Sequence, residues 1–146
     1  MPTPREDPDM TRQTPSPATT RRAAAAPAWW PVVVDLVAVL AFVVIGRRSH
    51  AEGLDLPGLL GTLWPFVVGA VVGWASVTGV RWPLASVRAG AVVWVSTAVV
   101  GVLLRVVAGQ GVQVSFVIVT IVVLGVFVVG WRAVVALVRR MRTRRA

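Results

Sequence analysis

The fold of this chain can be inferred starting from WPVVVDLVAVLAFVVIG, residues 30–46. This stretch is long and apolar enough to cross a bilayer as a helix, because about 18 residues at ~1.5 Å each span roughly 27 Å. It nevertheless carries one acid, Asp35, inside the apolar run. An ionisable group in a membrane helix is costly, so it is usually paired or lines a watery cavity. The partner of Asp35 is therefore the first question that the sequence raises.

The composition of the whole chain is typical of a membrane protein. Of the 146 residues, 56% are hydrophobic and only 14% are charged, and the mean hydropathy is +0.76. A soluble domain keeps about 25% charged residues. The absence of cysteine and the single histidine, His50, exclude a disulfide framework, a thiolate metal site and a cluster of several histidines within one chain. No cofactor motif occurs, so we expect no cofactor, and we expect no nucleic-acid partner.

Four apolar stretches predict an all-α fold, a transmembrane bundle of four helices with a disordered N-terminal tail. The expected helices lie at about residues 29–46, 57–80, 87–107 and 114–138. Residues 1–28 are rich in proline and polar side chains and cannot bury enough apolar surface to order themselves. Residues 139–146 are expected to form a basic C-terminal tail. Each apolar run is too long, and alternates too little, for a strand of a membrane barrel.

The distribution of arginine predicts an orientation in the membrane. The formal net charge is +9, and every basic residue is arginine. Four helices place both termini on one side, and most arginines fall on that side. The positive-inside rule therefore favours a plasma-membrane protein with both termini in the cytoplasm. The arginines of residues 139–145 are expected to contact anionic lipid headgroups.

Small residues indicate how the second and third helices pack. Gly69 and Gly73 form a GxxxG motif, which lets a neighbouring helix approach closely. Gly90, Thr97 and Gly101 fall near one face of the third helix, which we expect to pack against the second. Such small-residue faces also favour a homo-oligomer or another membrane partner.

Asp35 has three possible roles. We expect an ion pair between Asp35 and Arg88, which would tie the first helix to the third; Arg132 and Arg81 are the other cations near that end. The carboxylate could instead bind a proton or a cation, or it could extend toward the membrane surface. Trp74 and Trp94 fall near the middle of their helices and are expected to be packing residues.

The segment RRSHAEGLDLP, residues 47–57, is the densest cluster of functional groups in the chain. Arg47 and Arg48 oppose the positive-inside rule unless Glu52 and Asp55 pair with them or they bind something. The segment could bind an anion or a headgroup, could be an ordered loop held by its own salt bridges, or could be catalytic. The candidate binding residues of the chain are Asp35, Arg47, Arg48, His50, Glu52, Arg88 and Arg105.

Several short sequences carry a resemblance to a known family. They are Asp35, GRRSHAEG at 46–53, WPF at 64–66, RAG at 88–90, LR at 104–105, SF at 115–116 and GWR at 130–132. This pattern resembles the four-helix membrane proteins catalogued as domain of unknown function 3054, over roughly residues 31–132. The resemblance supports the four-helix interpretation and adds weight to Asp35 and to residues 47–57. It implies no activity and no substrate.

Three functions from different classes remain open at the level of sequence. We expect a small transporter-like or solute-binding module, which would make Asp35 essential for activity. The first alternative is a non-catalytic assembly or scaffold component, which would depend on Gly69 and Gly73. The second is a membrane enzyme acting on a lipid-linked substrate, which would need residues such as His50 or Glu52.

Overall fold

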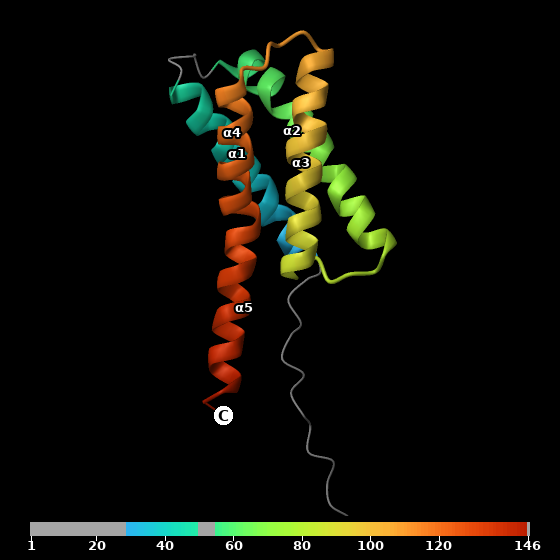
Figure 1. Ribbon diagram of the computed structural model, residues 1–146, viewed down its shortest axis with the longest axis vertical. Coiled ribbons are helices and arrows are strands. Elements are labelled where there is room, and N and C mark those ends of the chain that lie inside the picture. The colour runs from blue at the N-terminus through green and yellow to red at the C-terminus, as the bar shows by residue number, and fades with distance from the viewer. Residues whose placement is uncertain (1–28, 50–54, 146) are drawn as a thin grey trace, which may run out of the picture.

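The computed structural model describes residues 29–49 and 55–145, and these residues form helices with no strand among them. The predicted all-α fold of four long helices is confirmed, and each is long and apolar enough to cross a membrane. Three of them are α1 (Trp30–Ser49), α2 (Leu56–Gly79) and α3 (Val87–Val107). The fourth consists of α4 (Val114–Leu124), a π-helical segment η1 (Gly125–Val129) and α5 (Gly130–Thr143) (Figure 1). The expected disordered tail, residues 1–28, lies outside the described residues.

Two boundaries differ from those expected. The first helix continues to Ser49, so Arg47 and Arg48 lie in its last turn and not in a loop. The fourth helix continues to Thr143, so most of the basic tail is helical. In both places arginines occupy the last turn, where a positive charge interacts favourably with the helix dipole. A prediction from apolarity alone therefore places the end of a helix too early where the helix continues through charged residues.

Short polar side chains start α2 and α3. Asp55 accepts a hydrogen bond from the backbone N–H of Gly58 at 2.9 Å, which caps α2. Ser86 accepts one from the N–H of Ala89 at 3.2 Å, which caps α3. Both satisfy backbone donors that have no partner inside the helix. Gln113 occupies the same position before α4 but makes no capping hydrogen bond with its side chain.

The helices α2 and α3 pack with their backbones in direct contact. A Cβ atom added at Gly69 would lie 2.8 Å from the Cα atom of Thr97, and one added at Gly73 would lie 2.7 Å from the Cα atom of Val93. A Cβ atom at Gly101 would meet the ring of Phe66. These glycines therefore create the α2–α3 contact within one chain.

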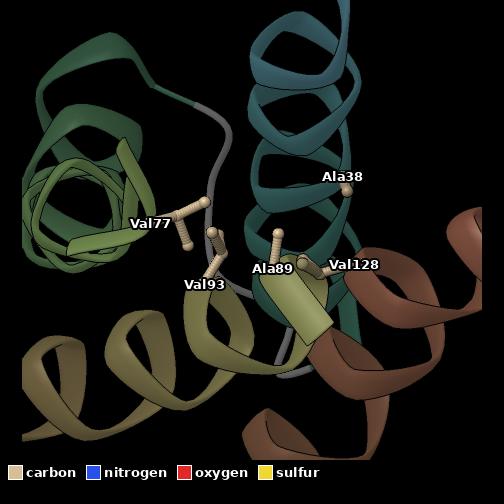
Figure 2. Close-up of a cluster of buried hydrophobic side chains, with 5 residues drawn as sticks. All are labelled: Ala38, Val77, Ala89, Val93 and Val128. Carbon is tan, nitrogen blue, oxygen red and sulfur yellow. The ribbon is translucent and has the colours of Figure 1, made fainter. Parts of the chain in front are cut away.

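The core consists of two apolar clusters along the bundle. One contains Ala38, Val77, Ala89, Val93 and Val128, contributed by α1, α2, α3 and η1; Figure 2 shows their side chains gathered where these elements meet. The other contains Val39, Phe42, Val43, Phe66 and Leu124.

We call the end of the bundle where α1 begins, and from which α5 emerges, the terminal end. Figure 1 shows α5 extending beyond the other helices there.

The π-helical segment η1 lies beside Trp94 of α3. The Trp94 indole donates a hydrogen bond to the carbonyl of Ile121 at 2.9 Å. A Cβ atom at Gly125 would lie 3.1 Å from the Trp94 ring, a tight contact, so the absence of a side chain at Gly125 helps the indole to lie close to the fourth helix. Trp94, expected only to pack, therefore also joins α3 to the fourth helix by a hydrogen bond.

Candidate functional site

Asp35 forms a fully buried ion pair with Arg132 near the terminal end. Arg132 Nη1 donates to Asp35 Oδ1 at 2.6 Å, and Nη2 donates to Oδ2 at 2.7 Å. Neither side chain is exposed. Two parallel hydrogen bonds between a guanidinium and a carboxylate are the strongest arrangement available to these groups. The pair joins residues 97 positions apart and ties α1 to α5.

Two tryptophans complete the surroundings of the Asp35 carboxylate. The Trp131 indole donates to Oδ1 at 3.1 Å, and the Trp74 indole donates to Oδ2 at 3.0 Å. Each carboxylate oxygen thus accepts two hydrogen bonds, which fills its usual capacity. The mid-helix position of Trp74 predicts a packing residue, but its indole also binds the carboxylate.

Arg132 is held by three helices and a turn. Besides Asp35, its Nε donates to the carbonyl of Leu84 at 3.0 Å, and Nη1 donates to the carbonyl of Val128 at 2.7 Å. A Cβ atom at Gly90 would lie 2.5 Å from the Arg132 Cδ atom, so Gly90 makes room for this side chain. The guanidinium also lies 4.2 Å from the centre of the Trp131 ring.

The predicted pair between Asp35 and Arg88 is wrong. Arg88 is exposed near the start of α3, and Asp35 is bound by Arg132. The expectation that Gly90 packs against α2 is wrong as well, because Gly90 faces Arg132 of α5. Both errors have one cause: the sequence gives the order of residues along each helix but not the direction that each helix turns toward its neighbours.

The ion pair has the properties of a structural clamp. An unpaired carboxylate in an apolar interior would be available to a proton or a cation. Asp35 instead has every acceptor position occupied by a donor of the same chain. A cation could reach the carboxylate only by displacing Arg132 or an indole.

A second cluster joins α1 to α2 at the opposite end. Arg47 Nη1 donates to the carbonyl of Gly58 at 3.1 Å and to the hydroxyl of Thr62 at 3.0 Å. Its Nη2 lies 3.5 Å from Asp55 Oδ1, a wider ion pair whose carboxylate is largely exposed. Arg47 thus pairs with Asp55, as the sequence allowed, while Arg48 is exposed. The other loop candidates, His50 and Glu52, lie outside the described residues.

Gln110 connects the loop before α4 to α2. Its side-chain amide donates to the carbonyl of Gly61 at 3.0 Å. In a regular helix this carbonyl would accept a bond from the residue four positions later, which here is Pro65 and has no N–H. The loop side chain thus supplies the donor that proline lacks. No sequence feature singled out Gln110, although Pro65 in a helix predicts an unsatisfied carbonyl at position 61.

These elements enclose a groove of about 500 Å³ at the opposite end. Its apolar wall comes from α1 and α4, and its two cationic side chains, Arg47 and Arg105, come from α1 and α3. The Arg105 guanidinium lies 4.6 Å from the centre of the Phe116 ring. Among the described residues, no acid lines the groove. The lining residues are Phe42, Val43, Ile45, Gly46, Arg47, Thr62, Arg105, Gln110, Gly111, Val112, Gln113, Ser115, Phe116, Val119 and Val123.

The structure separates the sequence-predicted candidates into two groups. Arg47 and Arg105 meet in the groove, whereas Asp35 is buried near the terminal end and Arg88 is exposed there. Sequence reasoning named Arg132 only as another cation near Asp35, and it assigned no role in a site to Trp131, Gln110 or Phe116. Among residues 29–49 and 55–145, no three His, Cys, Asp or Glu side chains gather into a potential metal site.

Comparison with known proteins gives a family and no activity. A family model described as "Protein of unknown function (DUF3054)" matches residues 32–135, which is more than half of the chain. Neither a search of curated proteins nor a search of solved structures found a match. The matched region holds most of α1, all of α2 and α3, both core clusters, the buried ion pair and the groove. The chain belongs to the DUF3054 family.

Proposed function

We propose that this protein is a solute-binding membrane protein and that the groove at the opposite end of the bundle is its binding site. The observation that carries the proposal is the groove itself, about 500 Å³ with two arginines among its lining residues. That volume lies in the range of small-molecule sites, which are mostly apolar with a few polar groups that orient the ligand. Asp35 supports folding in this proposal and does not bind the solute.

Two variants of one helix make the proposal testable. Val119 lines the groove and Val122 does not, yet both lie on α4 with similar exposure, 49% and 56%. Val119→Trp should fill the groove, and Val122→Trp should leave it open. The protein is extracted gently from its own membrane and analysed by native mass spectrometry. We expect a bound small molecule on the wild-type protein and on Val122→Trp, and its loss from Val119→Trp.

Either of two results would contradict the proposal. The first is that no small molecule accompanies the wild-type protein, and the second is that Val119→Trp retains it. A second polypeptide in the extracted particle would favour the scaffold alternative. The structure gives that alternative less support, because Gly69 and Gly73 are used by the contact between α2 and α3.

We further propose that the chain crosses the plasma membrane four times with both termini in the cytoplasm. The terminal end carries Arg81 and Arg88 beside the turn between α2 and α3, and residues 139–145 add five more arginines. The positive-inside rule supports this orientation. The chain has no cysteine, so single cysteines at Ala146 and at the exposed Ala108, which follows α3, can report on each side. A membrane-impermeant maleimide added to intact cells should label only Ala108→Cys; labelling of Ala146→Cys instead would reverse the orientation.

A further inference from the structure

The two ends of the groove differ in chemistry. Arg47 and Arg105 lie where α1 and α3 end, next to the loop that precedes α4. Arg47 donates hydrogen bonds to α2 and pairs with the largely exposed Asp55, which does not line the groove. Arg105 lies against Phe116 in the first turn of α4. Among the described lining residues the charged side chains are these two arginines, so the lining itself carries positive charge.

The start of α4 adds to this positive charge. The first backbone N–H groups of any helix have no partner inside it, and they carry a partial positive charge. Asp55 and Ser86 satisfy such groups at α2 and α3, whereas the Gln113 side chain does not do so at α4. Gln113 and Ser115 both line the groove. A helix end of this kind attracts anions when arginines stand beside it.

The rest of the groove is apolar. Phe42 and Val43 of α1 face Val119 and Val123 of α4 there, and no charged side chain joins them in the described residues. From Ser115 to Val123 the helix advances eight residues, about 12 Å. At roughly 30 Å³ for each water-sized group, the groove has space for about 17 such groups. That is enough for one alkyl chain and a head group, but not for two long chains.

We propose that the groove binds a single-chain anionic amphiphile. The carboxylate or phosphate lies beside Arg105 at the start of α4, and the alkyl chain lies between α1 and α4. This inference rests on the proposed function, since it names the ligand class of the same groove. A free fatty acid and a single-chain phosphate ester share this chemistry.

The experiment compares three probes with one alkyl chain and different head groups: dodecanoate, dodecyl phosphate and dodecanol. The full-length protein is placed in phosphatidylcholine nanodiscs, and the affinity for each probe is measured by native mass spectrometry. We expect one molecule of either anion to bind, and dodecanol to bind at least tenfold more weakly. The tighter anion indicates whether the physiological ligand carries a carboxylate or a phosphate.

Variants assign the binding to this groove. Arg105→Gln should weaken the binding of both anions about tenfold or more, because it removes a charged hydrogen-bond donor, and it should leave the binding of dodecanol unchanged. Ser115→Glu is a second variant in case Arg105→Gln does not fold. Ser115 is exposed, and an acid in the first turn suits a helix, yet it would repel an anion. Arg88→Gln, which changes an exposed arginine at the terminal end, should leave the binding of all three probes as it is.

The outcomes separate the two proposals. Equal affinity for dodecanol and dodecanoate, with no effect of Arg105→Gln or Ser115→Glu, would overturn the anionic class while groove binding survives. Groove binding is itself overturned if none of the three probes binds, or if Val119→Trp binds them as well as the wild-type protein does. Selective anion binding that is lost in Val119→Trp and weakened in Ser115→Glu supports both proposals.

Discussion

Gln110 donates its side-chain amide to the carbonyl of Gly61 across 49 positions of sequence, at 3.0 Å. The bond exists because Pro65 leaves that carbonyl without a backbone donor. One proline in α2 thus fixes the loop before α4, and that loop forms part of the groove. Pro65 in α2 and Gln110 in the loop before α4 therefore form a single structural unit.

This relationship predicts a measurable coupling between Gln110 and Pro65. Gln110→Ala should lower the free energy of unfolding by about 1 kcal/mol, because it removes a side-chain donor from an acceptor that proline cannot serve. In a Pro65→Ala background the new N–H of residue 65 can bond to Gly61, so the same change should cost much less. Unfolding in detergent, followed by circular dichroism, gives the four values of the cycle. Equal costs in both backgrounds would show that Gln110 does not compensate for Pro65.

The buried pair of Asp35 and Arg132 should be a major determinant of stability. Asp35→Asn and Arg132→Met each leave one buried polar or charged group without its counterpart, and we expect each to lower the free energy of unfolding by about 3–5 kcal/mol. The double variant removes both charges, and its asparagine side chain keeps an oxygen that can accept from the indoles. It should therefore be more stable than either single variant.

The matched control for the ion pair is Arg88→Met. Arg88 is exposed, so this change should shift the free energy of unfolding by no more than about 0.5 kcal/mol. A double variant less stable than both single variants would refute the clamp. So would an Arg88→Met variant as unstable as Arg132→Met.

Glycines of α2 should differ sharply in their tolerance of alanine. Gly73→Ala places a Cβ atom 2.7 Å from the Cα atom of Val93, so α2 and α3 must move apart. We expect a loss of about 1–3 kcal/mol, as for other overpacked interiors. Gly79→Ala meets nothing within 4 Å and should cost nothing, since alanine favours helix. Thermal unfolding of both variants in one detergent tests the difference, and similar melting temperatures would contradict the close contact.

The π-helical segment should tolerate the loss of one residue. A turn closed by i→i+5 hydrogen bonds holds one residue more than an α-helical turn. Deleting the exposed Val126 from η1 should therefore leave α4 and α5 in their present orientations, with Arg132 still facing Asp35. Deleting the exposed Val99 from α3 should rotate one half of that helix by about 100° against the other. Folded yield after membrane extraction should be near normal for the first deletion and low for the second; the reverse order would exclude this account of η1.

The arginines at the end of the fourth helix should retain anionic lipid. Arg139, Arg140, Arg142, Arg144 and Arg145 are all exposed, and no acid lies among residues 133–146. Replacing all five by glutamine should lower the retention of phosphatidylglycerol relative to phosphatidylcholine in native mass spectra, at about 1 kcal/mol for each arginine near the surface. Neutralising Glu6, Asp7 and Asp9 is the control for pairing within the chain. If the retention of phosphatidylglycerol changes when these acids are neutralised but not when the five arginines are replaced, the predicted role of the arginines is wrong.

The number, the approximate limits and the membrane character of the helices can be predicted from local sequence alone. Length and apolarity are local quantities, so each of the four runs could be recognised without knowledge of the others. The cost of an acid in an apolar helix likewise identified Asp35 as a residue that needs a partner. Gly69 and Gly73 could be noticed because their spacing lies within one helix.

Which residues meet depends on how the four helices pack together. Arg88 and Arg132 were both near enough to Asp35 along their helices, and the rotation of each helix exposed one and buried the other. That rotation depends on packing among all four helices and on the extra residue of η1, which no single segment encodes. The groove is decided in the same way, because α1, α2, α3 and α4 each contribute a part of it. Contacts across 49 or 97 positions follow from the packing of the whole chain, and local sequence patterns do not specify them.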